Sequence, residues 1–308
     1  MLNTYGFSDN VQIFLFGHFY VRILTIIYKE TILFYSLLIE EFIMSSLPSL
    51  LMIGCGHMGK AMLKGWIKKG LNHSFIVNRH DFDLVTPHQL AHTIQDVPKT
   101  FQPEAVVLAV KPDQAAELIP HLKPWCKNIP VISVLGGKTL AWLQQQFGDH
   151  QSIIRVMPNT PSELGLGMTS MIANSQTQSD QKQIAERLFN AIGKTAWLDT
   201  EQEIDIATAI AGCGPAYIFL LAELLQKIGQ EKGLSEDLAR LLARQTVIGS
   251  AALLNHSREE AETLRKNVAT PNGITEQAVN VLIQPDAWPH ILSKALQAAA
   301  DRSRALSS

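Results

Sequence analysis

Three glycines at positions 54, 56 and 59 follow the apolar run at residues 50–53 and precede a stretch with helical spacing. The pattern G-x-G-x-x-G between a strand and a helix is typical of a turn that binds a dinucleotide. Gly54 would make the tight turn, Gly56 would let the main chain approach a pyrophosphate, and Gly59 would let the helix pack closely on the strand. The alternative is a glycine-rich turn with only a structural role.

The stretch after this turn has the spacing of an amphipathic helix. Met62, Leu63, Trp66 and Ile67 recur at intervals that place one apolar face against a sheet, and Gly70 is expected to end the helix. Free N–H groups and the macrodipole at the helix start favour an anion. The predicted cofactor contacts in the turn are Gly54, Cys55, Gly56, His57, Met58 and Gly59.

The end of the second expected strand, residues 74–77, indicates which dinucleotide binds. Asn78 and Arg79 stand where an NAD-specific site usually carries an acidic residue, and arginine there can accommodate a 2′-phosphate. The sequence therefore favours NADPH, with NADH as a possible second cofactor. Alternatively, Arg79 is a solvated surface cation that pairs with Asp81 or Asp83.

Length and composition indicate an ordinary globular protein of two domains. The chain has 308 residues, 46% hydrophobic content and a formal net charge of −2, which gives no basic excess for a nucleic-acid partner. Its three cysteines, Cys55, Cys126 and Cys213, are widely spaced and favour a reducing cytoplasm. The ten histidines show no ligand spacing, so no metal is expected.

Residues 1–43 differ in character from the rest of the chain. The run from Val11 to Tyr28 is apolar enough to suggest a membrane anchor, but His18 and Arg22 lie within it and charge at a bilayer centre is costly. A signal peptide fits poorly because the basic start and the small-residue cleavage site are missing. We expect an upstream extension that is not part of the fold, and no membrane partner.

Alternating strand and helix signals continue to about residue 200. The order predicts an α/β fold with a Rossmann-type, mostly parallel sheet and helices on both faces, as the first domain at residues 44–200. Further strands are expected at residues 105–110, 129–134, 153–157, 168–173 and 195–198.

From Glu203 onward only helical spacing remains, with one long apolar segment around residues 220–228 and another helix that begins after Ser235. An all-helical second domain at residues 201–308 with this much apolar surface is expected to bury part of it against a second subunit.

Four further motifs occur in order, and together with the glycine turn they resemble pyrroline-5-carboxylate reductase. The resemblance runs from about Leu50 to the C-terminal helices. The motifs are Ala109-Val110-Lys111-Pro112, residues 155–161 (RVMPNTP), residues 212–217 (GCGPAY) and residues 270–275 (TPNGIT).

The resemblance implies an NADP-binding Rossmann domain and a helical dimerisation and substrate domain, in a homodimer or a higher assembly of dimers whose subunits complete each other's sites. Ala109, Val110, Lys111 and Pro112 would border the nicotinamide, and residues 155–161 would shape the pocket. The main chain of Val134, Leu135 and Gly136 would face the cofactor as well. Lys111 read alone could be a plain solvated lysine, and the P-N-T-P run only turn chemistry.

The resemblance also implies the substrate site. The family pattern is close to S-P-G-G-T-T, and proline in the first turn of a helix would leave N–H groups free for a substrate carboxylate. Thr275 would lie near the substrate ring nitrogen as the catalytic side chain. Without the resemblance, Thr270 reads as a simple helix cap. The implied substrate contacts are Asn267, Thr270, Pro271, Asn272, Gly273, Ile274 and Thr275.

The activity that the resemblance implies is NADPH-dependent reduction of the small molecule 1-pyrroline-5-carboxylate to L-proline. The chain departs from the family pattern at Asn272, Ile274, Ala211 and Cys213. Cys213 is not expected to be a nucleophile, because no histidine lies beside it in the sequence. The alternatives are a silent dinucleotide-binding regulator and another NADPH-dependent dehydrogenase, such as a hydroxy-acid dehydrogenase. The latter would need a Lys or His acid that no motif supplies.

Overall fold

The structure, a computed structural model, describes residues 46–307. The expected extension at residues 1–43 and the apolar run from Val11 to Tyr28 lie outside the described residues. Pro48 to Ser308 forms one unit of dense internal contacts, and the description below concerns this unit.

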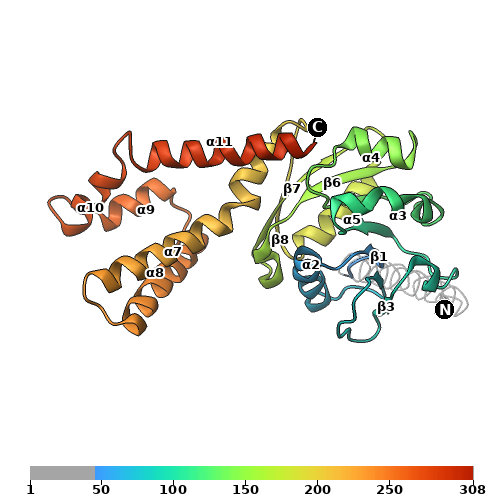
Figure 1. The fold of residues 1–308 in the computed structure, drawn as a ribbon, viewed down its shortest axis with the longest axis horizontal. Coiled ribbons are helices and arrows are strands. Elements are labelled where there is room, and N and C mark those ends of the chain that lie inside the picture. Colours follow the sequence, from blue (N-terminus) through green and yellow to red (C-terminus); the bar gives the residue numbers. More distant parts are fainter. Residues whose placement is uncertain (1–45, 308) are drawn as a thin grey trace, which may run out of the picture. The chain divides into compact units, whose positions relative to one another are not determined.

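Eight strands form one sheet in the order β3-β2-β1-β4-β5-β6-β7-β8 (Figure 1). All neighbouring strands pair in parallel except β6 and β7, which confirms the expectation of a mostly parallel sheet. The strands are β1 (Leu50–Ile53), β2 (Phe75–Val77), β3 (Gln89–Ala91), β4 (Ala105–Leu108), β5 (Val131–Ser133), β6 (Ile153–Met157), β7 (Gly167–Ala173) and β8 (Gly193–Trp197).

Two features of the sheet differ from the sequence prediction. The short edge strand β3 was not predicted, and it pairs in parallel with β2 through Phe75 and Gln89. The antiparallel direction of β7 was not predicted either. The link from β6 to β7, residues 158–166, is shorter than the roughly dozen residues that a parallel crossover needs, so the chain must turn back.

Helices α2 to α5 lie against this sheet (Figure 1). The predicted helix after the glycine turn is confirmed, and Gly70 with a φ of 79° follows its end. Its Trp66 is completely buried, donates a 2.7 Å hydrogen bond to the carbonyl of Leu188 and meets the Phe189 ring edge-on. The helices are α2 (His57–Lys68), α3 (Ala115–Leu122), α4 (Leu140–Phe147) and α5 (Ser179–Asn190).

From Glu203 to Ser307 the described chain is helical and contains no strand, as predicted. Ser235 caps α8 by accepting a hydrogen bond from the N–H of Leu238. A single π-helical turn at Thr208–Gly212 lies between α6 and α7. The helices are α6 (Glu203–Ala207), α7 (Gly214–Glu231), α8 (Glu236–His256), α9 (Ala261–Val268), α10 (Ile274–Leu282) and α11 (Trp288–Ser307).

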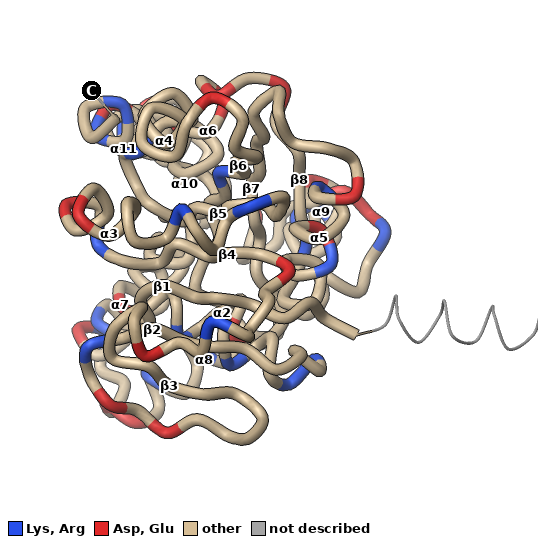
Figure 2. The backbone as a smooth tube through the Cα atoms, turned by 90° about the vertical axis from the view of Figure 1, so that its right-hand side faces the viewer, with Lys and Arg blue, Asp and Glu red and all other residues tan. Residues whose placement is uncertain are grey.

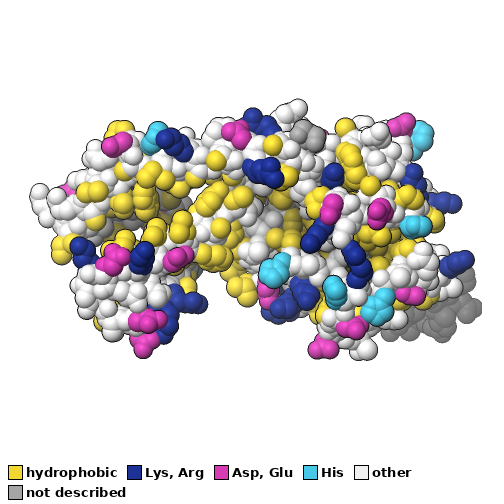
Figure 3. Space-filling model, viewed as in Figure 1, with side chains coloured by type: hydrophobic (Ala, Val, Ile, Leu, Met, Phe, Trp, Pro, Cys, Tyr) yellow, Lys and Arg dark blue, Asp and Glu magenta, His cyan; other side chains and the backbone are white. Residues whose placement is uncertain are grey.

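These C-terminal helices leave most of their apolar side chains uncovered. Helices α7, α9 and α10 bury no residue at all, and Phe219 is 66% exposed. Figure 3 shows apolar side chains gathered over this part of the chain. By length and composition alone, the helical stretch Glu203–Glu231 is also apolar enough to cross a membrane, with a mean hydropathy of 1.7 over 18 residues. Exposed apolar side chains that extend over several helices indicate a surface that another molecule covers.

Charged side chains do not separate by sign. Basic and acidic residues are interspersed along the described backbone (Figure 2), in line with the small net charge. This distribution lacks the clustered basic stripe that typifies a nucleic-acid-binding face.

Candidate functional site

The glycine turn after β1 has the geometry that a dinucleotide requires. Gly54 has a φ of 86°, and a Cβ there would lie 2.7 Å from the carbonyl oxygen of Ala109. Gly56 is exposed, and a Cβ added to it would meet no atom within 4 Å. Gly54 is therefore needed for the turn itself, whereas Gly56 leaves open the space that a pyrophosphate would approach.

The start of α2 can accept an anion. The helix has no side-chain cap and no acidic residue in its first turn, so its leading N–H groups have no partner within the helix. His57 and Gly56 are exposed at this end, while Cys55 is buried beneath it. These features fit the phosphate-binding role expected for the turn.

The carboxyl ends of four adjacent strands bring the predicted cofactor residues together. Gly54 donates to the carbonyl of Val77 at 2.8 Å, Ala109 to that of Ile53 at 2.7 Å, and Val134 to that of Leu108 at 3.0 Å. The glycine turn, the end of β2, the loop after β4 and the turn after β5 thus share one edge. Lys111, in the β4 loop, is exposed.

The end of β2 uses its two polar residues differently. The side-chain oxygen of Asn78 accepts from the N–H of Cys55 at 3.1 Å, and its amide nitrogen donates to the carbonyl of His80 at 2.7 Å. Arg79 is exposed and makes no ion pair among the described residues, whereas Asp81 lies 3.4 Å from the ring of His92. Neither Asp81 nor Asp83 therefore pairs with the guanidinium of Arg79.

The predicted substrate residues span the end of α9, the linking loop and the first turn of α10, and the hydrogen bonds of the linking loop and of their side chains stay within residues 259–277. Gly273 donates to the carbonyl of Thr270 at 2.9 Å, and Asn272 has a left-handed φ of 61°. Asn267 donates to Glu259 at 3.3 Å. Ile274 is 92% exposed and Thr275 is half-buried. No hydrogen bond joins this loop to the cofactor residues of the same described chain.

The local structure of this loop corrects two expectations. The helix begins at Ile274 with Gly273 as its N-cap, so Pro271 is not in the first turn and Thr270 is not the cap. Asn272 in the left-handed conformation turns the chain and delays the helix start. The N–H of Asn272 is also not free, because it donates to the carboxylate of Glu276 at 2.8 Å. The first N–H groups of α10 still lack a side-chain cap.

The motif at residues 155–161 forms a support beside the site. Arg155 is not part of the loop but the central residue of β6, is 1% exposed and lies 2.7 Å from the carboxylate of Glu201. Asn159 donates to the carbonyl of Ala211 at 2.9 Å and accepts from the N–H of Met168 at 2.9 Å. Sequence reasoning did not name the contacts of Arg155 with Glu201 and of Asn159 with Ala211, because each joins residues far apart along the chain.

The π-helical turn positions the G-C-G-P-A-Y motif. Cys213 donates its N–H to the carbonyl of Thr208, and the hydroxyl of Tyr217 donates to the carbonyl of Ala209 at 3.1 Å. Burial, with smaller contributions from the neighbouring Cys213, raises the pKa of Tyr217. Single π-turns are frequent at functional sites. This turn contains Ala211, whose carbonyl accepts the hydrogen bond from Asn159.

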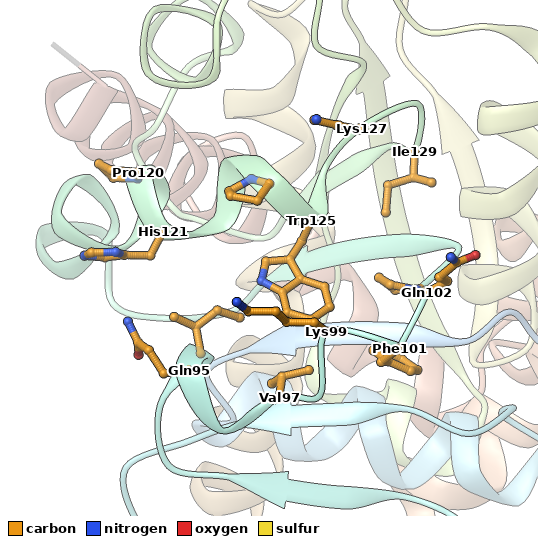
Figure 4. Close-up of a pocket in the computed structure, with 13 residues that line it drawn as sticks. Gln95, Val97, Lys99, Phe101, Gln102, Pro120, His121, Trp125, Lys127 and Ile129 are labelled. Carbon is orange, nitrogen blue, oxygen red and sulfur yellow. The ribbon is translucent and has the colours of Figure 1, made fainter.

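A separate groove of about 700 Å³ lies at the opposite edge of the sheet (Figure 4). It is lined by Phe101 and Trp125 with Lys99 and Lys127, in segments that precede β4 and β5 or follow α3. Because ligands of such sheets bind at the carboxyl ends of the strands, this groove is not the cofactor site. Among residues 46–307 no cluster of His, Cys, Asp and Glu could hold a metal ion.

Comparison with known proteins relates both parts of the chain to described families. The family "NADP oxidoreductase coenzyme F420-dependent" matches residues 49–137. The family "pyrroline-5-carboxylate reductase dimerisation" matches residues 201–306.

Individual relatives cover most of the chain. Pyrroline-5-carboxylate reductase 1 of Bacillus subtilis is 32% identical over 263 residues, which are 83% of this chain and 88% of the relative. The reductase of Pseudomonas aeruginosa is 32% identical over 85% of this chain and 97% of its own length.

Solved structures extend the similarity to the fold. The Coxiella burnetii reductase has a TM-score of 0.78 at 33% identity and covers 85% of this chain and 100% of its own. The Plasmodium falciparum enzyme, solved with NADP bound, has a TM-score of 0.71 at 30% identity and covers 85% and 98%.

The fold, the glycine turn and these matches define an NAD(P)-dependent oxidoreductase with a Rossmann domain followed by a helical dimerisation domain. More specifically, the chain belongs to the pyrroline-5-carboxylate reductase family. The exposed apolar helices lie within the segment that matches the dimerisation family.

Proposed function

We propose that the protein reduces the cyclic imine 1-pyrroline-5-carboxylate to L-proline with NADPH, the last step of proline biosynthesis. The observation that carries this proposal is the convergence of the glycine turn, the β4 loop and the β5 turn at one sheet edge, in a member of the reductase family. The substrate contacts and the cofactor preference below belong to the same proposal.

When bound, the reduced nicotinamide supplies the hydride that attacks the imine carbon. The protein holds the two reactants at near-attack distance and excludes water. The first N–H groups of α2 and the open Gly56 hold the pyrophosphate. Residues 109–112 and 134–136 border the nicotinamide.

The substrate binds at the loop before α10. The uncapped N–H groups of Ile274 and Thr275 receive its carboxylate, and the Thr275 hydroxyl contacts the ring nitrogen. A protonated ring nitrogen makes the imine carbon more electrophilic, so the hydroxyl orients or relays this proton without acting as a strong acid. Asn267, Thr270, Pro271, Asn272 and Gly273 shape the loop.

NADPH is the preferred cofactor in this proposal. Arg79 is exposed at the end of β2 and has no ion-pair partner among the described residues, which leaves its guanidinium available to a 2′-phosphate. Asn78 supports the turn beside it.

The working form is a cytoplasmic homodimer, in which dimers can assemble further. The uncovered faces of α7 to α10 supply the interface, and the substrate loop of one subunit completes the cofactor site of its partner. The three free cysteines suit a reducing compartment.

A turnover assay tests the proposal. Purified dimeric protein should oxidise NADPH only when 1-pyrroline-5-carboxylate is added, with proline as the product. NADPH binding without turnover would favour the silent regulator, whereas turnover of a hydroxy acid or keto acid instead would favour another dehydrogenase.

A further inference from the structure

Residues far away along the chain contact the turn after β5 and the helix start that follows it. We call residues 134–139, which run from Val134 to Thr139, the cofactor turn. Gly137 has a φ of 74° and is buried, and Thr139 caps α4 by accepting from the N–H of Trp142 at 3.0 Å. The turn therefore depends on its neighbours for its conformation.

The first neighbour is Glu201, at the start of the dimerisation segment. Its Oε1 accepts from the N–H of Leu140 at 2.8 Å, directly after the cofactor turn. The same oxygen lies 2.7 Å from Nη1 of Arg155, whose side chain is 2% exposed. The buried guanidinium thus holds the carboxylate in place, and the carboxylate holds the first residue of α4.

The second neighbour is Leu306, at the end of α11. A Cβ added at Gly137 would lie 2.5 Å from the carbonyl oxygen of Leu306 and 2.8 Å from its Cβ. Such distances are shorter than non-bonded atoms tolerate. The last turn of α11 therefore lies directly against the main chain of Gly137.

The end of α11 is itself anchored to α6. The hydroxyl of Ser303 donates to Oδ1 of Asp205 at 2.6 Å, and Nε of Arg304 lies 3.9 Å from the other carboxylate oxygen. The Asp205 side chain is 13% exposed, so it is an interior attachment point. Through Asp205 the position of Leu306 is fixed relative to the start of the dimerisation segment.

Glu201 and Leu306 stand at opposite ends of the dimerisation segment; Leu306 lies against Gly137 within the cofactor turn, and Glu201 binds the N–H of Leu140 directly after it, in the same protomer. We propose that they form a two-point clamp that sets the position of the cofactor turn. Both are positioning residues that act through the main chain of the turn. This inference rests on the proposed function for its consequence, which is that the dimerisation segment controls cofactor affinity from within one protomer.

The clamp is tested by releasing the end of α11 without touching the cofactor site. Asp205→Ala removes the anchor for Ser303, while Asp237→Ala is a matched control, because Asp237 pairs with Arg240 on the exposed surface of α8. Amide hydrogen exchange at residues 134–139 of the dimer, without cofactor, should become about tenfold faster in Asp205→Ala and stay unchanged in Asp237→Ala. Unchanged exchange in Asp205→Ala would overturn the clamp.

Cofactor binding gives the second readout. Asp205→Ala should raise the Kd for NADPH about tenfold, with a smaller change in the KM for 1-pyrroline-5-carboxylate. A merely smaller folded fraction would lower the number of sites and leave the Kd unchanged. If exchange quickens while the wild-type protein binds no NADPH, the clamp stands and the proposed function fails. Faster exchange with an unchanged Kd would show that the turn does not contact the cofactor. It would contradict the inference that the dimerisation segment controls cofactor affinity.

A second pair of variants covers the case in which Asp205→Ala does not fold. Gly137→Ala inserts a methyl group into the contact with Leu306. Gly70→Ala is the control, because Gly70 has a similar left-handed φ of 79° but an added Cβ there would meet no atom within 4 Å. Faster exchange at residues 134–139 only in Gly137→Ala supports the clamp, and equal exchange in both variants contradicts it.

Discussion

The side-chain oxygen of Asn78 accepts a 3.1 Å hydrogen bond from the main-chain N–H of Cys55, so the end of β2 holds the glycine turn directly. The same amide donates to the carbonyl of His80, which places Asn78 between the turn and the loop that follows β2. Both ends of the amide are engaged within the protein. The position that carries an acidic residue in many NAD-binding sites supports the turn here.

Asn78→Ala should weaken NADPH and NADH equally. The change leaves the N–H of Cys55 without its acceptor and loosens the turn that both cofactors share. We expect a loss of about 1 kcal/mol in binding free energy for each cofactor, measured by fluorescence titration. A loss confined to NADPH would mean that Asn78 contacts the 2′-phosphate instead.

Arg79→Ala should change the preference between the cofactors. Loss of a charged hydrogen bond to the 2′-phosphate costs about 1.5 to 3 kcal/mol for NADPH and leaves NADH nearly unchanged. Lys69→Ala is a control, because it removes the same charge at the far end of α2. Equal losses for both cofactors would exclude Arg79 as the residue that reads the phosphate.

Local patterns in the sequence predicted the elements that carry the cofactor site. Gly54, Gly56 and Gly59 stand between a continuous apolar run and a helical repeat, and this combination has one common structural solution. The strand β3 could not be predicted in this way. Gln89, Leu90 and Ala91 are too few for a periodic signal, and they form a strand only because β2 pairs with them.

Contacts between distant residues account for what the sequence did not reveal at the site. The bond from Asn159 to Ala211 and the approach of Leu306 to Gly137 each join residues separated by many elements. The direction of β7 was accessible in principle, because the link after β6 is too short for a crossover. The start of α10 was misplaced because Asn272 takes a left-handed conformation that a Thr-Pro pair does not reveal.

The buried thiol of Cys55 should make stability depend on pH at alkaline values. Burial raises its pKa to about 11 from an ordinary value of 9.0, although the Lys60 ammonium partly opposes the shift. Between these values the unfolded chain releases a proton that the folded protein keeps, so the free energy of unfolding falls as the pH rises from about 9 to about 11. Urea unfolding measured across this pH range should show a smaller fall in the free energy of unfolding for Cys55→Ala than for the wild-type protein. An equal fall in both proteins would contradict the raised pKa of Cys55.

Glu276→Gln should improve substrate binding. The Glu276 carboxylate lies in the first turn of α10 and accepts from the N–H of Asn272, so it places a negative charge where the substrate carboxylate is proposed to bind. Glutamine retains an acceptor and removes the charge, which should lower the KM for 1-pyrroline-5-carboxylate by about twofold to fivefold. The effect should shrink in high salt. A raised KM would show that the carboxylate organises the loop for its substrate.

Thr275→Val should reduce turnover and leave cofactor binding intact. Valine preserves the shape of threonine in the first turn of α10 and removes the hydroxyl proposed to contact the ring nitrogen. The loss of kcat/KM with 1-pyrroline-5-carboxylate should equal about 1 to 3 kcal/mol of transition-state stabilisation. Thr263→Val, an exposed change on α9, is the control.

Gly273→Pro should reduce turnover further, and the structure changes the reason. Gly273 has a φ of −84°, which proline tolerates, so the torsion is not the cause. The variant loses the N–H that bonds to the carbonyl of Thr270, and its added atoms crowd Thr270, where a Cβ would lie 2.8 Å from Oγ1. For the Thr275 hydroxyl itself, the contradicting result is full activity of Thr275→Val together with unchanged binding of proline as an inhibitor. That result would mean that another group contacts the ring nitrogen.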